Sequence, residues 1–550
     1  FWLKLYRAQG ATALKIGAMV ADSSVLAQHK VAVTGALLLG TTVVIDVLRR
    51  RFRSRRQPGE VIPVPPGAWP LAGHFFSLLR YGKDNMNLAS ARWALDLARN
   101  KGVTIFKANL LGYEFIGISD PDLAEEVYQG DPQKYTKDFS QVPLGGDLLA
   151  ISFGDGLFFA KTSDEKWQIP HRVLKTPFSV RGIRGIMPLM QEQADKLIVA
   201  LKREVGFGGD CYIDAWVTKM AFETIAVCGL GTSFNCFDDD KTHPFIVALN
   251  DTISSIDPLG RWPAALRPIF CRELLKKYHE SAKCVREFCM DVIRERRRTG
   301  VAGEGKKDLL DMMLGDVDPK TGKSMTETMI VDNVLTFLFA GQDSTAAAMA
   351  SMLCFLCSNP HCKEKLIREI HSVVGKGQLE WEHLSKLQYL DWCIKETIRL
   401  MPPAPGTLRT STQDQLLAGK WRVPANMPVI INIMAIHYSK ELWGEDADQF
   451  RPERWEHGQP HKFAYIPFST GPRQCTGREF TLVEQKLTMV KLFQNFDFQP
   501  SDSSKVEEGY VNVEHEGAKF PPFLAFDTQL KKDSGFIGLF RSFKLLEPTQ

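Results

Sequence analysis

The segment FAYIPFSTGPRQCTGREF, residues 463–480, constrains the fold more than any other part of this chain. It places one cysteine, Cys475, in a short loop between Gly471 and Gly477, with Arg473 beside it. A cysteine that binds a metal must be a thiolate, and a thiolate inside a protein needs hydrogen bond donors and positive charge nearby. The glycines permit a tight loop whose backbone amides point at sulfur. The pattern predicts a thiolate ligand at the positive end of the helix that follows. A structural cysteine in a glycine turn is the alternative.

The spacing Phe468-x-x-Gly471-x-Arg473-x-Cys475-x-Gly477 resembles the haem-binding loop of the cytochrome P450 family. In that family a cysteine thiolate holds the haem iron. The resemblance implies haem b as cofactor, with Cys475 as its axial metal ligand. It also implies that Phe468 packs beside the sulfur, that Gly477 leaves room for the haem, and that Arg473 pairs with a haem propionate.

A second stretch, LTFLFAGQDSTAAAMASML, places an acid and two hydroxyl groups inside an apolar helix. It resembles the oxygen-binding helix of P450s. The resemblance implies that the small residue Ala340 leaves space for dioxygen, and that Asp343 with Ser344 or Thr345 delivers protons. The usual threonine is replaced by Ser344, with Thr345 next to it, so either hydroxyl is a candidate. Hydroxyls that only bond back to the helix are the structural alternative.

Two further stretches resemble parts of P450s that support the haem. KETIRL and FRPERW provide Glu396, Arg399 and Arg454, which match a buried triad in which the glutamate pairs with both arginines. The segments EKWQIPHRV and PGTLRTS match positions that contact the haem propionates. The candidates there are Trp167, His171, Arg172 and Arg409.

The substrate is less constrained. SFGDGLFFAK resembles a segment of bacterial fatty-acid-hydroxylating P450s, which implies that Phe158 lies over the haem and shapes the substrate pocket. The early strand that binds a fatty carboxylate in those enzymes has Tyr113 here but no arginine. A sterol and a fatty acid therefore remain alternative substrates. The stretch SSIDPLGRWPAALRPIF is expected to dip into a membrane, with Trp262 at the interface.

The N-terminal region predicts a membrane anchor. Residues 31–45 are uncharged, and six arginines follow within residues 49–56. By the positive-inside rule the rest of the chain would face the cytosol. We expect an anchor over residues 1–56, a proline-rich hinge over 57–74 and one catalytic domain over 75–550, at the endoplasmic reticulum membrane. A buried core helix or a targeting peptide are the alternatives.

Helical patterns outweigh strand patterns along the rest of the chain. We expect helices at 187–205, 272–298, 326–357, 362–374 and 390–400, and strands at 103–110, 114–119 and 428–434. These patterns predict a mainly α fold with small β-sheets, which is the fold class of P450s. The eleven cysteines are scattered through apolar stretches, which favours reduced thiols over a disulfide framework.

Taken with the resemblance, these features predict a haem-thiolate monooxygenase that uses O2 to oxidise an apolar lipid. Its electrons are expected from a separate NADPH–cytochrome P450 reductase, which would dock near Lys462, Arg473 and Arg478. A net charge of +4 over 550 residues does not indicate a nucleic acid partner. A haem-thiolate isomerase or peroxide-using enzyme, or a haem sensor without catalysis, are the alternatives.

Overall fold

A computed structural model describes residues 59–70, 72–82, 89–139, 145–206, 210–238, 243–260, 262, 264–300 and 307–500, with short pieces at 514–515, 518–519 and 542–546. The predicted anchor over residues 1–56 lies outside these residues. Over the described ranges, no helix is both long enough and apolar enough to cross a bilayer.

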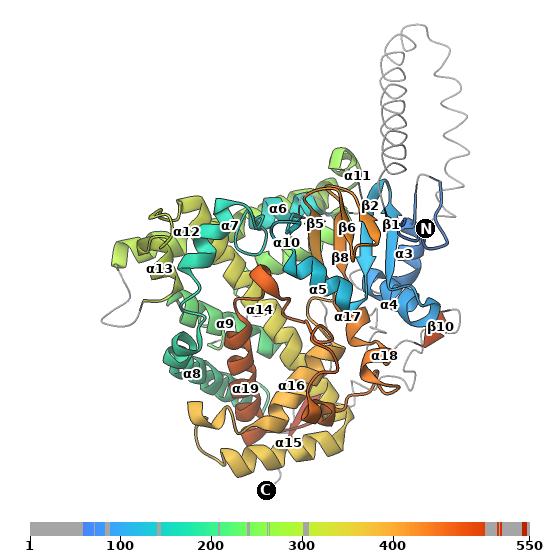
Figure 1. Cartoon of the computed structure of the whole chain (residues 1–550). Helices are drawn as coiled ribbons and strands as arrows, with labels where there is room; N and C mark the ends of the chain where they lie inside the picture. Colours follow the sequence, from blue (N-terminus) through green and yellow to red (C-terminus); the bar gives the residue numbers. More distant parts are fainter. Residues whose placement is uncertain are drawn as a thin grey trace, which may run out of the picture.

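Helices dominate the described residues, and the strands are short (Figure 1). The helices are α3 (Phe75–Tyr81), α4 (Ala89–Lys101), α5 (Pro121–Gln129), α6 (Gly146–Phe153), α7 (Glu165–Val173), α8 (Val180–Glu204), α9 (Ile213–Leu230), α10 (Pro244–Gly260), α11 (Arg267–Phe270), α12 (Arg272–Thr299), α13 (Leu309–Gly315), α14 (Glu327–Ser358), α15 (Pro360–Val373), α16 (Gln388–Leu400), α17 (Ile433–His437), α18 (Lys440–Trp443) and α19 (Arg478–Asn495). The strands are β1 (Ile105–Leu110), β2 (Tyr113–Ile118), β3 (Tyr135–Thr136), β4 (Asp210–Tyr212), β5 (Thr407–Ser411), β6 (Gln415–Leu417), β7 (Trp421–Val423), β8 (Pro428–Ile431), β9 (Asp497–Pro500), β10 (Glu514–His515), β11 (Ala518–Lys519) and β12 (Ser542–Leu546).

The largest sheet has five strands in the order β1-β2-β8-β5-β3 and lies to one side of the helices (Figure 1). β1 and β2 are antiparallel, β8 runs parallel to β2, and β5 runs antiparallel to β8. Strand β8 ends at Ile431 rather than at the expected residue 434. The backbone and side-chain amides of Asn432 both donate to the carbonyl of Ile118, at 2.8 and 3.2 Å. After these bonds the chain turns into α17.

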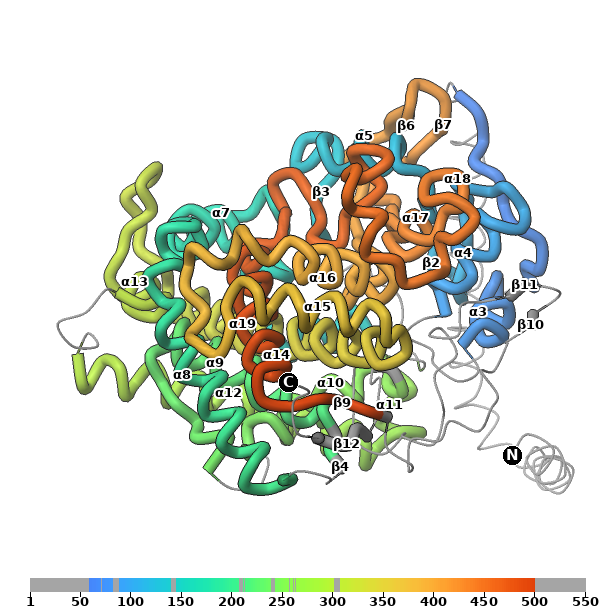
Figure 2. The backbone as a smooth tube through the Cα atoms, turned by 90° about the horizontal axis from the view of Figure 1, so that it is seen from below, coloured from blue at the N-terminus to red at the C-terminus, as the bar shows by residue number. Residues whose placement is uncertain are grey.

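Helix α14 lies in the centre of the main hydrophobic core and is buried on nearly all faces. Its length and apolar composition explain this position, because a helix that is hydrophobic all round must be covered on all sides. Thr326 caps its N-terminus by accepting a hydrogen bond from the backbone N–H of Met329 at 3.3 Å. Helices α9, α12, α16 and α19 pack against it, and α15 and α16 run beside it in the view from below (Figure 2).

The helix expected at 187–205 begins earlier, at Val180. Ser179 caps the extra turns, since its hydroxyl accepts from the backbone N–H of Gly182 at 3.3 Å. The cap precedes a stretch with two glycines and a proline, which hid the first turns of the helix in the sequence pattern. The predicted mainly α fold with small sheets is confirmed.

Candidate active site

The cysteine loop closes on itself through a backbone hydrogen bond. The N–H of Cys475 donates to the carbonyl of Phe468 at 2.8 Å. Gly471 has a φ of +69°, and a Cβ atom there would lie 2.9 Å from the carbonyl oxygen of Tyr128. Both the backbone conformation and this contact require glycine. Helix α19 begins at Arg478, so Cys475 lies just before the N-terminal end of a long helix.

The surroundings of Cys475 indicate that it lies beside an open space within the molecule, which we call the hollow. The residue is exposed, and yet enough protein surrounds it for burial to raise the pKa of its thiol. The backbone N–H of Gly477 and the charges of Lys137 and Arg478 act in the opposite direction. These groups stabilise a thiolate, and a bound metal cation would complete its deprotonation.

Three cations lie close to one another beside this loop, with one carboxylate among them. Arg409 Nε is 2.8 Å from Asp131 Oδ2, and both residues are buried. Burial lowers the pKa of Lys137, and the charges of Arg473 and Arg409 lower it further. Burial, with Arg409 as a second cause, lowers the pKa of Arg473 to about 9. The cluster therefore has an excess of positive charge and would be stabilised by an anionic ligand.

A stack of three side chains adjoins this cation cluster. The rings of Trp167 and His171, one turn apart on α7, are stacked with centroids 4.3 Å apart. The guanidinium carbon of Arg473 lies 4.9 Å from the centroid of the Trp167 ring. Burial lowers the pKa of His171, and Arg473 contributes to the shift, so the ring is neutral at neutral pH.

The structure does not bring Arg172 into this group. Its guanidinium pairs with both carboxylate oxygens of Asp318, Nε to Oδ1 at 2.6 Å and Nη2 to Oδ2 at 2.7 Å. The position next to His171 on a helix directs the two side chains away from each other, since neighbours in a helix do not share a face. The guanidinium of Arg172 is therefore engaged by Asp318 and does not join the cation cluster.

The two hydroxyls on α14 have different surroundings. Ser344 is exposed, and its Oγ donates to the carbonyl of Ala340 at 2.8 Å. Thr345 is buried, and its Oγ1 shares a hydrogen bond of 2.8 Å with Oγ1 of Thr481 on α19. Ser344 is therefore the exposed one of the two residues, and its hydroxyl makes the bond back to the helix that the structural alternative describes.

The acid beside Ser344 titrates near neutral pH. Burial raises the pKa of Asp343 to about 7, with the charge of Asp214 as a second cause. Burial also raises the pKa of Asp214, on α9, to about 6. Asp343 can therefore bind and release a proton under physiological conditions, which a carboxyl with an ordinary pKa does far less readily.

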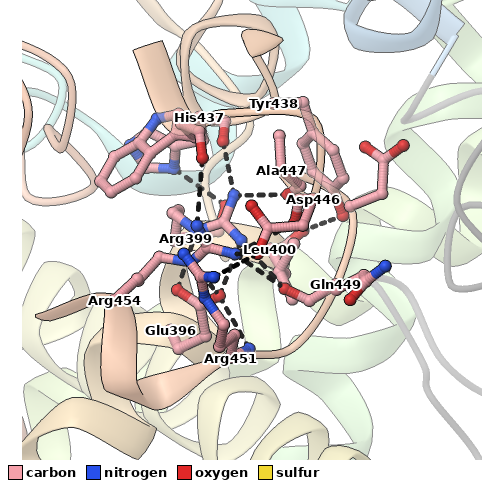
Figure 3. A network of polar contacts seen from close by, with 12 residues as sticks. Glu396, Arg399, Leu400, His437, Tyr438, Asp446, Ala447, Gln449, Arg451 and Arg454 are labelled. Carbon is pink, nitrogen blue, oxygen red and sulfur yellow. Dashed lines mark hydrogen bonds and ion pairs between the residues drawn. The ribbon is translucent and has the colours of Figure 1, made fainter.

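A buried ionic network joins α16 to the segment after α18 (Figure 3). Glu396 accepts two hydrogen bonds from Arg399, both at 2.8 Å, and one from Arg454 Nε at 2.7 Å. The indole N–H of Trp455 also donates to Glu396, at 3.0 Å. The side chains of Glu396 and Arg399 are fully buried, so both charges depend on these partners.

His437 connects this network to the cysteine loop. Its Nδ1 lies 3.0 Å from the carbonyl oxygen of Arg399, and its Nε2 accepts from the backbone N–H of Ile466 at 3.1 Å. Burial, helped by the charge of Arg399, lowers the pKa of His437 to about 3. A neutral ring whose Nε2 accepts must carry its proton on Nδ1, which then donates to Arg399. The contact to Ile466 holds the chain two residues before Phe468.

Phe158 lies between the cations and α14. Its ring is 6.3 Å from that of Phe339, the residue before Ala340, and Lys137 Nζ is 3.6 Å from its centroid. The residue is 40% exposed although its neighbour Phe159 is buried. This partial exposure next to α14 indicates that the Phe158 ring lines the hollow.

A family model described as "Cytochrome P450" matches residues 63–513. The chain belongs to the cytochrome P450 family. The heme domain of cytochrome P450DA, a solved structure, superposes with a TM-score of 0.73 at 26% identity, covering 90% of this chain and 99% of that one. The predicted family and the fold class are thereby confirmed.

Curated P450 relatives include longer proteins. The self-sufficient cytochrome P450 monooxygenase CYP505U2 of Exserohilum turcicum is 31% identical over 81% of this chain and 40% of its own length. CYP505E3 of Phanerodontia chrysosporium, of the same description, is 33% identical over 80% of this chain and 40% of its length. A bifunctional cytochrome P450/NADPH–P450 reductase of Aspergillus oryzae is 30% identical over 81% and 40%. The chain thus spans about 40% of the length of these relatives.

The cofactor of this family and fold is haem b with a cysteine thiolate as axial ligand. The residues present fit such a group. The Cys475 residue is exposed to the hollow, and no atom lies within 4 Å of a Cβ built at Gly477, which leaves space for a flat ligand. The buried Nη2 of Arg409 has no hydrogen bond partner within the described ranges, and a carboxylate of the haem would supply one.

Several residues of this P450 site escaped the sequence analysis. Lys137 and Asp131 belong to the cation cluster, and His437 joins the ionic network to the loop. No motif in the sequence marks Lys137 or Asp131. A histidine in an apolar segment such as MAIHY is a weak signal for a buried hydrogen-bonding role, because the same pattern occurs wherever a histidine packs in a core.

Proposed function

We propose that this chain is a haem-thiolate monooxygenase that inserts one oxygen atom of O2 into a C–H bond of an apolar lipid. The observation that carries the proposal is the position of Cys475. It is exposed to the hollow, it is flanked by cations, and it lies on the loop that resembles the haem-binding loop of the family. When bound, haem b with a thiolate ligand supplies the activation of dioxygen.

The proposed haem-binding set follows from the contacts above. Cys475 is the axial ligand, and Phe468 and Gly477 lie in its loop. Ala340 is the small residue that leaves room on α14. The propionate-binding residues are Trp167, His171, Lys137, Arg409 and Arg473.

The proposed proton route uses Asp343 and Ser344. Each turnover consumes two electrons and two protons and releases one oxygen atom as water. Asp343, with a pKa of about 7, takes up protons from its surroundings, and the exposed Ser344 hydroxyl passes them into the hollow. Thr345 is held by Thr481 and has a structural role in this scheme.

The substrate class is proposed from the hollow and its aromatic lining. Phe158 and Phe339 offer apolar contact, which suits a sterol or a fatty acid. On the early hairpin, Tyr113 is 56% exposed, and Lys107 is paired with Glu114 at 2.9 Å. The hairpin therefore offers a fatty carboxylate no free cation of its own.

An NADPH–cytochrome P450 reductase is the proposed electron donor. The Aspergillus oryzae relative combines such a reductase with a P450 in one protein, according to its name. Of the three predicted docking cations, Lys462 and Arg478 have exposed side chains, whereas Arg473 points into the site. The proposed docking surface therefore includes Lys462 and Arg478 only.

A membrane location is proposed from an apolar patch. Trp262 stacks on Phe270 at 4.8 Å, and Ile269 and Phe270 on α11 are 70% and 60% exposed. Such a patch suits contact with a lipid surface. Together with the apolar and arginine-rich N-terminal sequence, it supports a location at the endoplasmic reticulum membrane with the catalytic domain in the cytosol.

The proposed reaction can be tested with purified chain, a separate P450 reductase, NADPH and ¹⁸O2, using fatty acids and sterols as candidate substrates. We expect a product that carries one ¹⁸O atom, formed only when NADPH and reductase are both present. Product formation with hydrogen peroxide alone, and none with NADPH and reductase, would instead identify a peroxide-using enzyme. Absence of any product would favour a haem sensor.

A further inference from the structure

The loop that contains Phe158, residues 154–160, is fastened to α14 by side chains that the reaction does not require. The backbone N–H of Asp155 donates to Asp332 Oδ2 at 2.9 Å. The backbone N–H of Leu157 donates to Asn333 Oδ1, also at 2.9 Å. Two consecutive residues of α14 therefore bind the amides on either side of Gly156. A loop bound in this way has little freedom to shift along the helix.

Close packing fixes the distance between this loop and α14. A Cβ at Gly154 would lie 2.4 Å from the carboxylate of Asp332, and one at Gly156 would lie 2.1 Å from Thr336 Oγ1. Gly154 also has a φ of +61°, which favours glycine on its own. The loop can approach the helix this closely only because neither Gly154 nor Gly156 has a side chain.

The carboxylate of Asp332 is buried and has two partners. Its side chain is 4% exposed, and Arg286 on α12 donates to Oδ1 at 2.7 Å. Asp332 thus accepts from the loop with one oxygen and from α12 with the other. A buried carboxylate is stable only while such partners remain in place, so the two bonds support each other.

The opposite edge of the loop is bound by the cysteine loop. Arg473 donates to the carbonyls of Leu157 and Ala160 at 2.9 and 2.8 Å, and to that of Phe158 at 3.1 Å. The backbone of Phe158 is therefore held between α14 and Arg473. Its ring, 40% exposed, is the part of the loop that lines the hollow.

We propose that Asp332 is a specificity-determining positioning residue, which sets how far the Phe158 ring reaches into the pocket through its bonds to the Asp155 amide and to Arg286. This inference rests on the proposed role of Phe158 in the pocket. Asp332 itself touches neither substrate nor haem in this scheme. It determines the shape of the space that a substrate must fit, and thereby which part of a substrate lies nearest the reacting centre.

The test uses two haem ligands, imidazole and 4-phenylimidazole, titrated into the holoenzyme and followed by the shift of the Soret band. Both bind the iron through the same nitrogen, and only the second has a ring that must fit the pocket. The ratio of the two dissociation constants therefore reports pocket shape and cancels general effects on the haem. No turnover is needed, so the result is independent of whether the proposed reaction is correct.

We expect Phe158→Ala to change this ratio, and Asp332→Asn to change it by about three- to tenfold, as the loss of one or two hydrogen bonds on the loop would produce. In the Phe158→Ala background, adding Asp332→Asn should leave the ratio unaltered. Asp155→Asn is the matched control, because it removes an exposed ion pair with Lys166 from the same loop but keeps the backbone N–H. Its ratio should equal that of the wild type.

Two results would overturn the proposal: an unchanged ratio in Asp332→Asn, or the same change in the Phe158→Ala background, which would mean that Asp332 acts without Phe158. If Asp332→Asn does not bind haem, Asn333→Ala replaces it. That variant removes the acceptor of the Leu157 amide, together with the bond from Asn333 Nδ2 to the Met329 carbonyl, and leaves Asp332 in place. It should shift the ratio in the same direction, and failure to do so would contradict the proposal as well. Lack of product in the oxygen-labelling experiment would leave this result intact while refuting the proposed reaction.

Discussion

Ser344 and Thr345 are neighbours on α14, and only the first is exposed, whereas the hydroxyl of the second is paired with Thr481. We predict that Ser344→Ala lowers product formation by roughly 10²-fold, because it removes the proposed proton-transfer group from the site. NADPH consumption should fall much less, so the product formed per NADPH should decrease. Thr345→Val is the control and should stay within about threefold of the wild type. A larger loss in Thr345→Val than in Ser344→Ala would show that the buried hydroxyl carries the protons.

Glu484, on α19, is a buried acid that the proposed reaction does not use. Burial raises its pKa well above the ordinary value, and the neighbouring Thr224 acts in the opposite direction. Because the folded state holds this proton more tightly than the unfolded state, the free energy of unfolding falls as pH rises from the ordinary pKa toward the folded pKa. The slope contributed by one group is at most about 1.4 kcal/mol per pH unit.

We therefore predict that Glu484→Gln gains stability relative to the wild type as pH rises from about 5 to about 8, since glutamine has no proton to lose. Urea unfolding of the holoenzyme at several pH values measures the difference. Glu479→Gln, at a partly exposed residue of the same helix, should show no such trend. A constant difference across the pH range for Glu484→Gln would mean that this carboxyl titrates alike in both states.

At the residue scale, the sequence could predict those residues whose chemistry requires particular neighbours at particular positions in the chain. Cys475 stands out because a thiolate ligand needs glycines and cations around it, and Glu396 and Arg399 share a helix face by their separation of three. Lys137 and Asp131 could not be predicted, because their role arises from tertiary proximity to Arg409 and Arg473. The choice between Ser344 and Thr345 likewise depends on α19, which supplies the partner of Thr345.

The buried charges of Glu396, Arg399 and Arg454 join helix α16 to the segment after α18. Arg399→Met should lower the free energy of unfolding by about 3–5 kcal/mol, because Glu396 loses its bidentate partner while remaining buried. Haem retention should fall as well, since Arg399 also holds His437 and through it the chain before Phe468. Chemical denaturation and the haem-to-protein absorbance ratio measure these two effects.

Lys395→Met is the control for that variant, on the same helix. Lys395 pairs with Asp391 at 2.7 Å, with side-chain exposures of 38% and 28%, and such partly exposed pairs contribute at most about 1 kcal/mol. An Arg399→Met protein as stable as Lys395→Met would show that the buried network is dispensable.

At the element scale, long helices were predicted well because their apolar periodicity extends over many turns, as in α12 and α14. Their ends were predicted less well. The start of α8 depends on a cap at Ser179 before a glycine-containing turn. The end of β8 depends on a hydrogen bond from Asn432 to Ile118 on β2, a strand that is adjacent in the sheet but far away in the sequence. Such ends are set by single polar contacts, which periodicity does not register.

At the scale of the whole molecule, the candidate site is assembled from segments far apart in the sequence. The cations come from residues 137, 409 and 473, the acid and hydroxyl from α14, and the aromatic lining from the loop after α6. The family could be predicted from four separate motifs, since their joint occurrence is specific. The substrate could not, because the shape of the hollow depends on how the 154–160 loop rests on α14, and this contact appears only in three dimensions.

The central claim is that Cys475 is the thiolate ligand of the haem, and the spectrum of the reduced, CO-bound protein tests it most directly. We predict the red-shifted Soret band of thiolate ligation in the wild type, and in Cys284→Ala, which changes another exposed cysteine. The band should be absent from Cys475→Ala. A full thiolate-type band in Cys475→Ala, or none in the wild-type holoenzyme, would contradict the account.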